Sequence, residues 1–334
     1  MLFAGAMPGP RAAQTQSATL PIIFDTDMAF EDWIAMLFLL QHPAVEVRAV
    51  TIPGTGEAHC DPGVRNAMNL LMLAEKPDIP VACGRETPLF GSSTWPAEWR
   101  EYVDRMVGLS LPENPNPSDE RDAVELLQQT IEASEEPITL VAVGPLTNIA
   151  ELLQASPAAA EKIAMIYVMG GAVDVAGNLG DGGATENTTA EWNFYADPLA
   201  AAQVIESGIP ITLVPLDATQ AVPITGDFYD ALKEDRTTPV AEFVYQELTT
   251  LQVRRYSGWF FWDTLTSQAA VDESVVTIEE RTLRVIAEEG DEFGRSAPEE
   301  GGSRVRLAVD ADPALLEPII LNVLNGRDPS ASLN

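Results

Sequence analysis

Short apolar runs that alternate with amphipathic stretches constrain the fold of this chain more than any other feature of its sequence. Runs of strand length occupy 20–24, 45–52, 80–82, 138–143, 163–169 and 209–214. The stretches between them repeat apolar residues at helical spacing, most clearly over 31–41, 64–73, 123–133 and 198–207. Such alternation predicts a mostly parallel central sheet with helices on both faces. Because no repeat or linker interrupts the pattern, we expect one α/β domain over residues 19–330.

The rest of the chain is less regular. Residues 85–120 are rich in Pro, Ser, Gly and Trp, and residues 172–192 in Gly, Asn and Thr, so both are expected to be long polar loops. Helices are expected over 227–252, 262–270 and 313–324. Residues 275–287 and 304–309 are predicted to form a β-hairpin around an acidic, glycine-rich loop.

Four carboxylates follow the first predicted strand within eight residues: Asp25, Asp27, Glu31 and Asp32. Like charges this close repel one another unless a cation or shared protons hold them together. Hard divalent cations take oxygen ligands, so the cluster favours a Ca²⁺ or Mg²⁺ site at the mouth of the sheet. The alternative is a solvated acidic loop in which Asp25 or Asp27 caps the following helix.

The composition excludes several classes of partner. Asp and Glu number 51 against 19 Lys and Arg, a formal net charge of −32 spread over the whole chain. Without a basic patch we expect no nucleic-acid partner and no anionic membrane partner. The acidity suggests adaptation to high salt, a hypothesis that equal stability with and without salt would contradict.

The N-terminus and the cysteines leave the compartment open. Residues 1–18 resemble the tail of a secretory signal but lack its basic start, so they are expected to lie outside the fold, as a disordered segment or the remnant of a signal. The protein is then either cytoplasmic or, if the segment is a truncated signal, periplasmic or secreted. Cys60 and Cys83 form no metal motif, and the sequence does not decide whether they pair.

Further motifs follow later strands in the expected order. They are Val143-Gly-Pro-Leu-Thr-Asn148, Met169-Gly-Gly171, Ala190-Glu-Trp-Asn193 and Trp262-Asp263. Together with the cluster that opens at Asp25, this set resembles the inosine-uridine nucleoside hydrolase family, which cleaves the N-glycosidic bond of ribonucleosides. The matches span most of the chain, so the resemblance implies the Rossmann-like fold of that family. It also implies a homodimer or homotetramer.

The resemblance assigns roles residue by residue. A Ca²⁺ ion is implied on Asp27, Asp32, the carbonyl of Val143 and Asp263. Asp27 is also the implied general base, acting on a metal-bound water that attacks C1′, and Asn193 is the second residue implied to be catalytic. Contacts to the ribose are implied for Glu31, Met169, Asn178, Glu191 and Asn193. Asp25 is implied to orient the metal-binding residues without contacting the ion itself.

Departures from the family pattern point to the purine-specific branch. Trp262 stands where pyrimidine-accepting or nonspecific members have a histidine that protonates the leaving base. Purine-specific members instead stack tryptophans on the base, and Trp95, Trp99 and Trp192 fit that arrangement. The alternative for Trp95 and Trp99 is burial under a long loop. Glu31 replaces the usual aspartate, and Met28-Ala29 replaces the usual Pro-Gly.

Other functions remain as alternatives to purine nucleoside hydrolysis. One is hydrolysis of a pyrimidine or modified nucleoside, and another is nucleoside binding without catalysis. No Gly-x-Gly-x-x-Gly follows the first strand, which disfavours a dehydrogenase, and no Gly-x-Ser-x-Gly elbow or Cys–His pair suggests a covalent nucleophile. His42 is expected to cap a helix end. His59 is expected to be an exposed loop residue, and the alternative is a catalytic role as proton donor to the leaving base.

Overall fold

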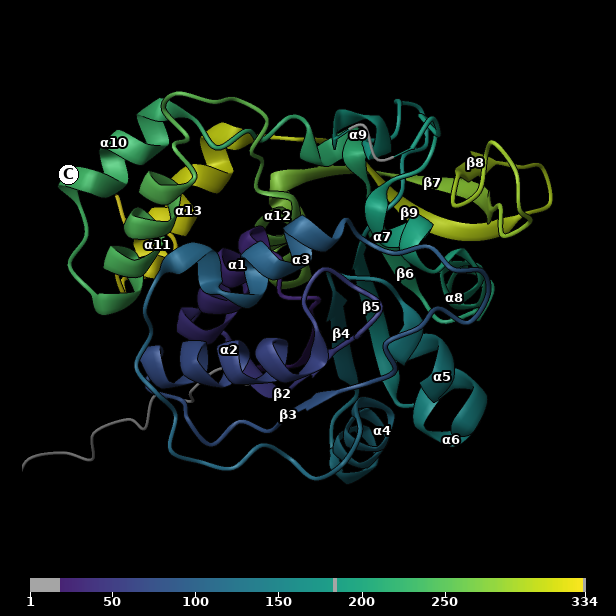
Figure 1. The fold of residues 1–334 in the computed structure, drawn as a ribbon, viewed down its shortest axis with the longest axis horizontal. Coiled ribbons are helices and arrows are strands. Elements are labelled where there is room, and N and C mark those ends of the chain that lie inside the picture. The colour runs from purple at the N-terminus through teal and green to yellow at the C-terminus, as the bar shows by residue number, and fades with distance from the viewer. Residues whose placement is uncertain (1–18, 183–184, 333–334) are drawn as a thin grey trace, which may run out of the picture.

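A nine-stranded sheet runs through the middle of the molecule in the order β3-β2-β1-β4-β5-β6-β9-β7-β8 (Figure 1). The structure, a computed structural model, describes residues 19–182 and 185–332, so the expectation for residues 1–18 lies outside the described residues. The strands are β1 (Leu20–Asp25), β2 (Val45–Ile52), β3 (Val81–Cys83), β4 (Ile138–Ala142), β5 (Ile163–Met169), β6 (Ile211–Val214), β7 (Val276–Val285), β8 (Ser296–Pro298) and β9 (Ser303–Ala311). Every pairing from β3 to β9 is parallel, whereas β7 is antiparallel to both of its neighbours.

Helices cover both faces of the sheet (Figure 1). One face carries α1 (Phe30–Gln41), α2 (Cys60–Leu73), α10 (Gly226–Glu234), α11 (Pro239–Thr250), α12 (Trp262–Val271) and α13 (Pro313–Leu324). The other carries α4 (Ala123–Ala133), α5 (Thr147–Ala155), α6 (Pro157–Ala160) and α8 (Pro198–Ile205). The sequence prediction of one α/β domain with a mostly parallel sheet is confirmed.

Strand β1 shows why the apolar runs are continuous. Ile22 and Phe24 belong to the core on one face of the sheet, and Ile23 belongs to the core on the other. All three side chains are fully buried or nearly so. Burying such a side chain contributes roughly 1.5–3 kcal/mol, so both faces of the strand stabilise the fold.

The chain reverses its direction across the sheet between β1 and β4. From β1 it moves outward through β2 and β3, then returns to place β4 on the other side of β1. The ends of these two central strands are joined directly, since the Val143 N–H donates to the Asp25 carbonyl at 2.8 Å. Ligands of open α/β sheets bind beyond the carboxyl ends of the strands at such a reversal.

The structure corrects four details of the sequence prediction. The expected loop over 85–120 contains helix α3 (Ala97–Asp104), and the loop over 172–192 contains a 3₁₀ turn at Leu179–Gly182. Helix α2 begins at Cys60, four residues before its predicted start at 64. The hairpin loop between β7 and β9 contains the short strand β8, which pairs with β7. In the described ranges no helix has the length and apolar character needed to cross a membrane.

Candidate active site

A cavity of about 590 Å³ lies beyond the carboxyl ends of the central strands. It is lined by every residue predicted to bind metal or substrate: Asp27, Glu31, Asp32, Trp95, Trp99, Val143, Met169, Asn178, Glu191, Trp192, Asn193, Trp262 and Asp263. Ten further residues complete its wall: Ala29, Phe30, Glu57, Glu98, Tyr102, Leu216, Gln220, Gly258, Trp259 and Phe260. The parallel sheet thus brings together segments that are more than two hundred residues apart.

Asp25 lies behind this cavity rather than in its wall. Its carboxylate is fully buried and accepts hydrogen bonds from Thr51 Oγ1 at 2.6 Å and from Asn148 Nδ2 at 2.8 Å. Burial raises the pKa of Asp25 to about 7, against the effect of these two donors. The side chain therefore fastens the ends of β1 and β2 to helix α5, and its role in orienting metal ligands stays a prediction.

Asp27 is buried where three segments converge. Its Oδ2 accepts from the Glu57 backbone N–H at 2.9 Å, and its carbonyl accepts from the Ala58 N–H at 2.9 Å. A Cβ at Gly56 would lie 2.0 Å from the Asp27 Cβ, and one at Gly144 would lie 2.9 Å from it. Burial raises the pKa of Asp27 to about 6. Both glycines are therefore needed for close approach to this carboxylate.

Glu31, Asp32 and Asp263 form a compact group of carboxylates. One oxygen of each lies within 4.8 Å of the other two. Asp32 Oδ1 accepts from the Thr26 hydroxyl, whereas Asp32 Oδ2 and Glu31 Oε2 are buried with no partner among the described residues. Burial first, and then repulsion from neighbouring carboxylates, among them Asp27, raises the pKa values of all three, that of Glu31 to about 8.

This arrangement fits a hard cation. Oxygen atoms are the ligands that Ca²⁺ and Mg²⁺ select, and two of those here are buried without a hydrogen-bond partner. The alternative of a solvated loop with an aspartate cap is wrong, because Asp25, Asp27 and Asp32 are buried. Helix α1 instead begins after Ala29, which offers no side-chain cap.

Asn193 joins the ends of two strands. Its Nδ2 donates to the carbonyl of Val143 at 3.0 Å and to that of Met169 at 3.3 Å. A carbonyl oxygen has two lone pairs, so this bond leaves Val143 able to accept a second partner. The amide thereby orients the one backbone carbonyl that was predicted to bind metal.

Glu191 is held by backbone donors. As the N-cap of helix α7 (Trp192–Ala196), it accepts from the N–H groups of Asn193 and Phe194, and also from that of Gly171. Burial raises its pKa to about 7, although these three bonds oppose the rise. Asn178 similarly accepts from the Trp192 N–H at 3.1 Å through Oδ1, which leaves its amide N–H₂ for a ligand.

Tryptophans supply much of the apolar wall. Trp95 stacks on Trp192 with ring centroids 4.7 Å apart and 18° between the planes, and the centroid of Trp99 lies 5.3 Å from that of Trp192. A base between two rings needs a gap of about 7 Å, twice a van der Waals contact, so none fits between Trp95 and Trp192. Trp262, the first residue of α12, packs instead against Phe260 on the preceding segment, with ring centroids 5.2 Å apart.

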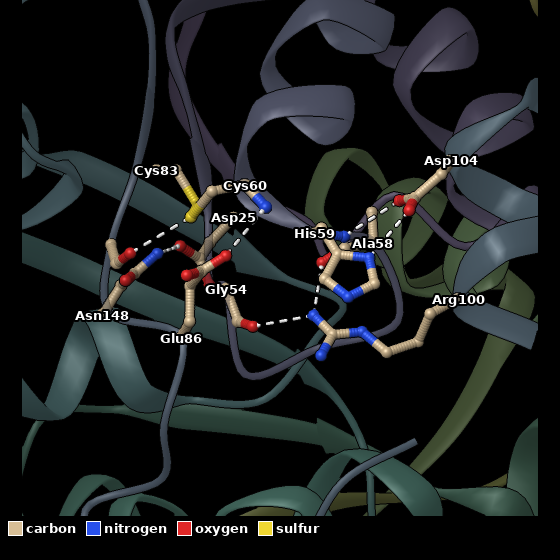
Figure 2. The surroundings of a disulfide bond; sticks show 11 residues. Asp25, Gly54, Ala58, His59, Cys60, Cys83, Glu86, Arg100, Asp104 and Asn148 are labelled. Carbon is tan, nitrogen blue, oxygen red and sulfur yellow. Dashed lines mark hydrogen bonds and ion pairs between the residues drawn. A yellow bond between two sulfur atoms is a disulfide. The ribbon is translucent and has the colours of Figure 1, made fainter. Parts of the chain in front are cut away.

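Sequence reasoning missed Glu57 and the residue that holds its loop. Arg100 of α3 donates to the carbonyls of Gly54, Glu57 and Ala58 at 3.1, 3.2 and 3.1 Å, and Figure 2 shows its guanidinium reaching Gly54 and Ala58. The only signal in the sequence was that 53–57 is a glycine-marked segment after a strand. Glu98 and Tyr102, also missed, lie one helical turn apart on α3.

Neither histidine lines the cavity. His42 is the C-cap of α1, as expected, and His59 pairs through Nδ1 with Asp104 Oδ2 at 2.7 Å (Figure 2). The question of the cysteines is answered, since Cys60 and Cys83 form a disulfide that joins the start of α2 to the end of β3 (Figure 2). This cross-link lies at the end of the loop that carries Glu57.

Comparison with known proteins identifies the family. A sequence profile described as inosine-uridine preferring nucleoside hydrolase matches residues 22–317. The chain belongs to this family. It is therefore a nucleoside hydrolase, an enzyme that acts on the N-glycosidic bond of ribonucleosides, and the interpretation of the sequence as an enzyme is confirmed.

Curated relatives differ from the predicted branch. The pyrimidine-specific ribonucleoside hydrolase RihA of Salmonella schwarzengrund is 38% identical over 231 residues, which are 67% of this chain and 70% of that protein. RihA of Klebsiella pneumoniae is 37% identical over 228 residues, with the same coverage. These names support nucleoside hydrolase activity, but they do not confirm the predicted assignment to the purine-specific branch.

Solved structures share the fold. The plant nucleoside hydrolase PpNRh1 superposes with a TM-score of 0.82 at 27% identity, covering 92% of this chain and 99% of that one. A purine-preferring ribonucleoside hydrolase from Gardnerella vaginalis gives 0.80 at 23% identity, covering 92% and 98%. The predicted nucleoside hydrolase fold is confirmed.

Proposed function

We propose that this nucleoside hydrolase acts on purine ribonucleosides with the help of Ca²⁺. The observation that carries the preference is that Trp262, next to Asp263, lines the same cavity as Trp99 and Trp192, while no histidine lines it. Flat aromatic faces bind bases by stacking, worth ~1–3 kcal/mol per base, and a purine offers the larger surface.

Four residues would hold the ion: Asp27, Asp32, Asp263 and, through its carbonyl, Val143. All are oxygen donors at the wall of one cavity, and the unpartnered Asp32 Oδ2 supports the assignment. When bound, the ion would fix the 2′ and 3′ hydroxyls of the ribose and lower the pKa of a neighbouring water. Chelation should therefore abolish hydrolysis, and adding Ca²⁺ back should restore it.

The protein's own groups then carry the reaction. Asp27 accepts a proton from the attacking water as the water oxygen bonds to C1′. The bond from C1′ to the base nitrogen breaks, and its electron pair goes to the base, through an oxocarbenium-like ribosyl species. Glu31, Asn178, Glu191, Asn193 and Met169 would hold the ribose meanwhile. The amide N–H₂ of Asn178 can donate to its hydroxyls. Glu31 and the Oδ1 of Asn193 can accept from them, since the Asn193 N–H₂ already donates to Val143 and Met169.

Pyrimidine hydrolysis is the second candidate, favoured by the names of the RihA relatives. A reducing-sugar assay over inosine, guanosine, uridine and cytidine decides between the two. We expect kcat/KM to be at least tenfold higher for inosine and guanosine, which corresponds to about 1.4 kcal/mol of stacking. Trp262→His should shift the ratio toward uridine, and parity between inosine and uridine in the unaltered enzyme would contradict the purine assignment.

A further inference from the structure

The charge of the cavity wall is unusually one-sided. Seven of its residues are acidic, and none of the residues that line it is a lysine, an arginine or a histidine. The acidic residues are Asp27, Glu31, Asp32, Glu57, Glu98, Glu191 and Asp263. Arg100 stays outside the wall, because its guanidinium is engaged by the carbonyls of the 54–58 loop. A divalent cation on three of these carboxylates still leaves the exposed carboxylate of Glu98 on the wall, with no basic lining residue to offset it.

The groups that could protonate a departing base are few. A neutral nucleoside releases its base as an anion unless an acid supplies a proton, and an imidazole is the usual donor near pH 7. Here the lining offers no imidazole, and Tyr102 alone carries a hydroxyl. The buried carboxyls of Glu31 and Glu191 also line the cavity, but they are assigned to the ribose hydroxyls and not to the base. The indole N–H groups of Trp95, Trp259 and Trp262 are unpartnered in the described structure, but an indole donates a hydrogen bond without giving up its proton.

The aromatic residues of the wall favour a cationic ligand, as the acidic residues do. Trp99, Trp192, Phe260 and Trp262 border the acidic floor of the cavity. A cation over an aromatic face is attracted by the ring quadrupole, most strongly when it is shielded from water. The net charge of −32 would also concentrate cations at the cavity mouth and repel phosphorylated ribosides.

Building on the proposed function, we propose that the best substrates are ribosides whose base already carries a positive charge, such as pyridinium ribosides and N7-alkylated purine ribosides. Water bonds to C1′ and gives its proton to Asp27, and the C1′–N bond breaks with its electron pair going to the ring nitrogen. That pair neutralises the base, which leaves as a neutral molecule. No acid is required, which explains an active site without a histidine.

The first test compares matched substrates. Guanosine is paired with 7-methylguanosine, and inosine serves as a neutral reference for nicotinamide riboside. Each kcat/KM is divided by the uncatalysed rate in the same buffer, since cationic ribosides are intrinsically more reactive. We expect the cationic member to exceed the neutral one by about tenfold or more. Equal corrected values would overturn the inference yet leave the hydrolase assignment intact, whereas no hydrolysis of any riboside would contradict the proposed function itself.

Binding can be separated from chemistry with unreactive bases. The 1-methylnicotinamide cation and neutral nicotinamide differ by one methyl group and one charge, and both can be tested as competitive inhibitors of inosine hydrolysis. The cation should give the lower inhibition constant. A tighter fit of the neutral base would contradict the charge argument.

A matched pair of variants locates the effect. Glu98 and Glu101 both lie on α3, but Glu98 lines the cavity and Glu101 pairs with Arg105 away from it. Glu98→Gln should lower the ratio of kcat/KM for 7-methylguanosine to that for guanosine by about two- to fivefold, as for loss of one exposed charge, and Glu101→Gln should not. An unchanged ratio in the Glu98→Gln variant would overturn the inference.

Discussion

Asp27 depends on its neighbours for both its position and its protonation state. Backbone donors from Glu57 and Ala58 fix its carboxylate and carbonyl, and burial raises its pKa to about 6. A carboxylate with that pKa is ionised at neutral pH and is still basic enough to accept a proton from an activated water. The geometry therefore suits the role of general base.

Replacing Asp27 should remove catalysis while sparing the fold. We expect Asp27→Ala to lower kcat by at least about 10²–10⁴-fold, the usual contribution of a general base, with a further loss if the ion no longer binds. Steady-state kinetics on inosine measures the effect, and circular dichroism shows whether the variant is folded. A folded variant that keeps most of its turnover would contradict the assignment.

Gly56 permits the close approach to Asp27 and offers a gentler test. A Cβ at this position would lie 2.0 Å from the Asp27 Cβ, so Gly56→Ala must push the loop and the carboxylate apart. We expect at least a tenfold loss of kcat/KM. Gly226→Ala is the control, because its Cβ would lie 3.9 Å from its nearest side-chain neighbour. Similar activity in the two variants would show that the loop tolerates the displacement.

At the scale of elements, α3 and the loop after β2 form one unit of the cavity wall. Three hydrogen bonds from Arg100 tie the helix that carries Trp99 and Glu98 to the loop that carries Glu57. The disulfide at Cys60 anchors the far end of the same loop (Figure 2). A substitution that displaces α3 should therefore also displace the loop after β2, and the reverse should hold as well.

Arg100→Met should loosen this unit. The substitution keeps the length of the side chain but leaves three carbonyls without their donor, so we expect KM for nucleosides to rise by about tenfold or more, with a smaller fall in kcat. Arg105→Met is the control, since Arg105 lies on the surface just after the same helix and pairs only with Glu101 among the described ion pairs. Equal KM values for the two variants would contradict the coupling.

The order of the elements could be read from the sequence because each buried strand is an apolar run and each helix an amphipathic one. The acidic cluster and the turns after the strands were recognisable too, since glycine and polar residues mark the places where parallel strands end. Glu57, Glu98 and Tyr102 were missed because nothing in their local sequence distinguishes them from surface residues. Their placement depends on α3 folding over the cavity, and the role of Glu191 as a helix cap depends equally on tertiary contacts.

At the scale of the whole molecule, buried carboxylates link stability to pH and metal. The folded-state pKa values of Asp27, Asp25 and Glu31 are about 6, 7 and 8, above the ordinary 3.8 or 4.5. Between about pH 4 and pH 8 the folded chain therefore holds protons that the unfolded chain releases. It follows that the free energy of unfolding of the metal-free protein falls as the pH rises through this window.

A divalent cation should reverse this trend. It would bind the ionised carboxylates of the folded state only. At a hundredfold excess over Kd, Ca²⁺ should therefore stabilise the protein by about 2.7 kcal/mol at pH 8 and by less at pH 5. Thermal unfolding with Ca²⁺ and with chelator at both pH values measures the difference, and Mg²⁺ serves as the comparison ion. An equal effect of Ca²⁺ at the two pH values would contradict the carboxylate site.

The reversal of the chain between β1 and β4 also has a consequence for how the enzyme matures. The cavity needs Asp27 from the first strand loop, Asn193 from the middle of the chain and Asp263 from a late helix. Contacts between residues so distant in sequence form late and slowly, because long loops must close first. A nascent or truncated chain would thus contain most of the sheet yet no complete site, and nucleoside cleavage would begin only when the last helices have docked.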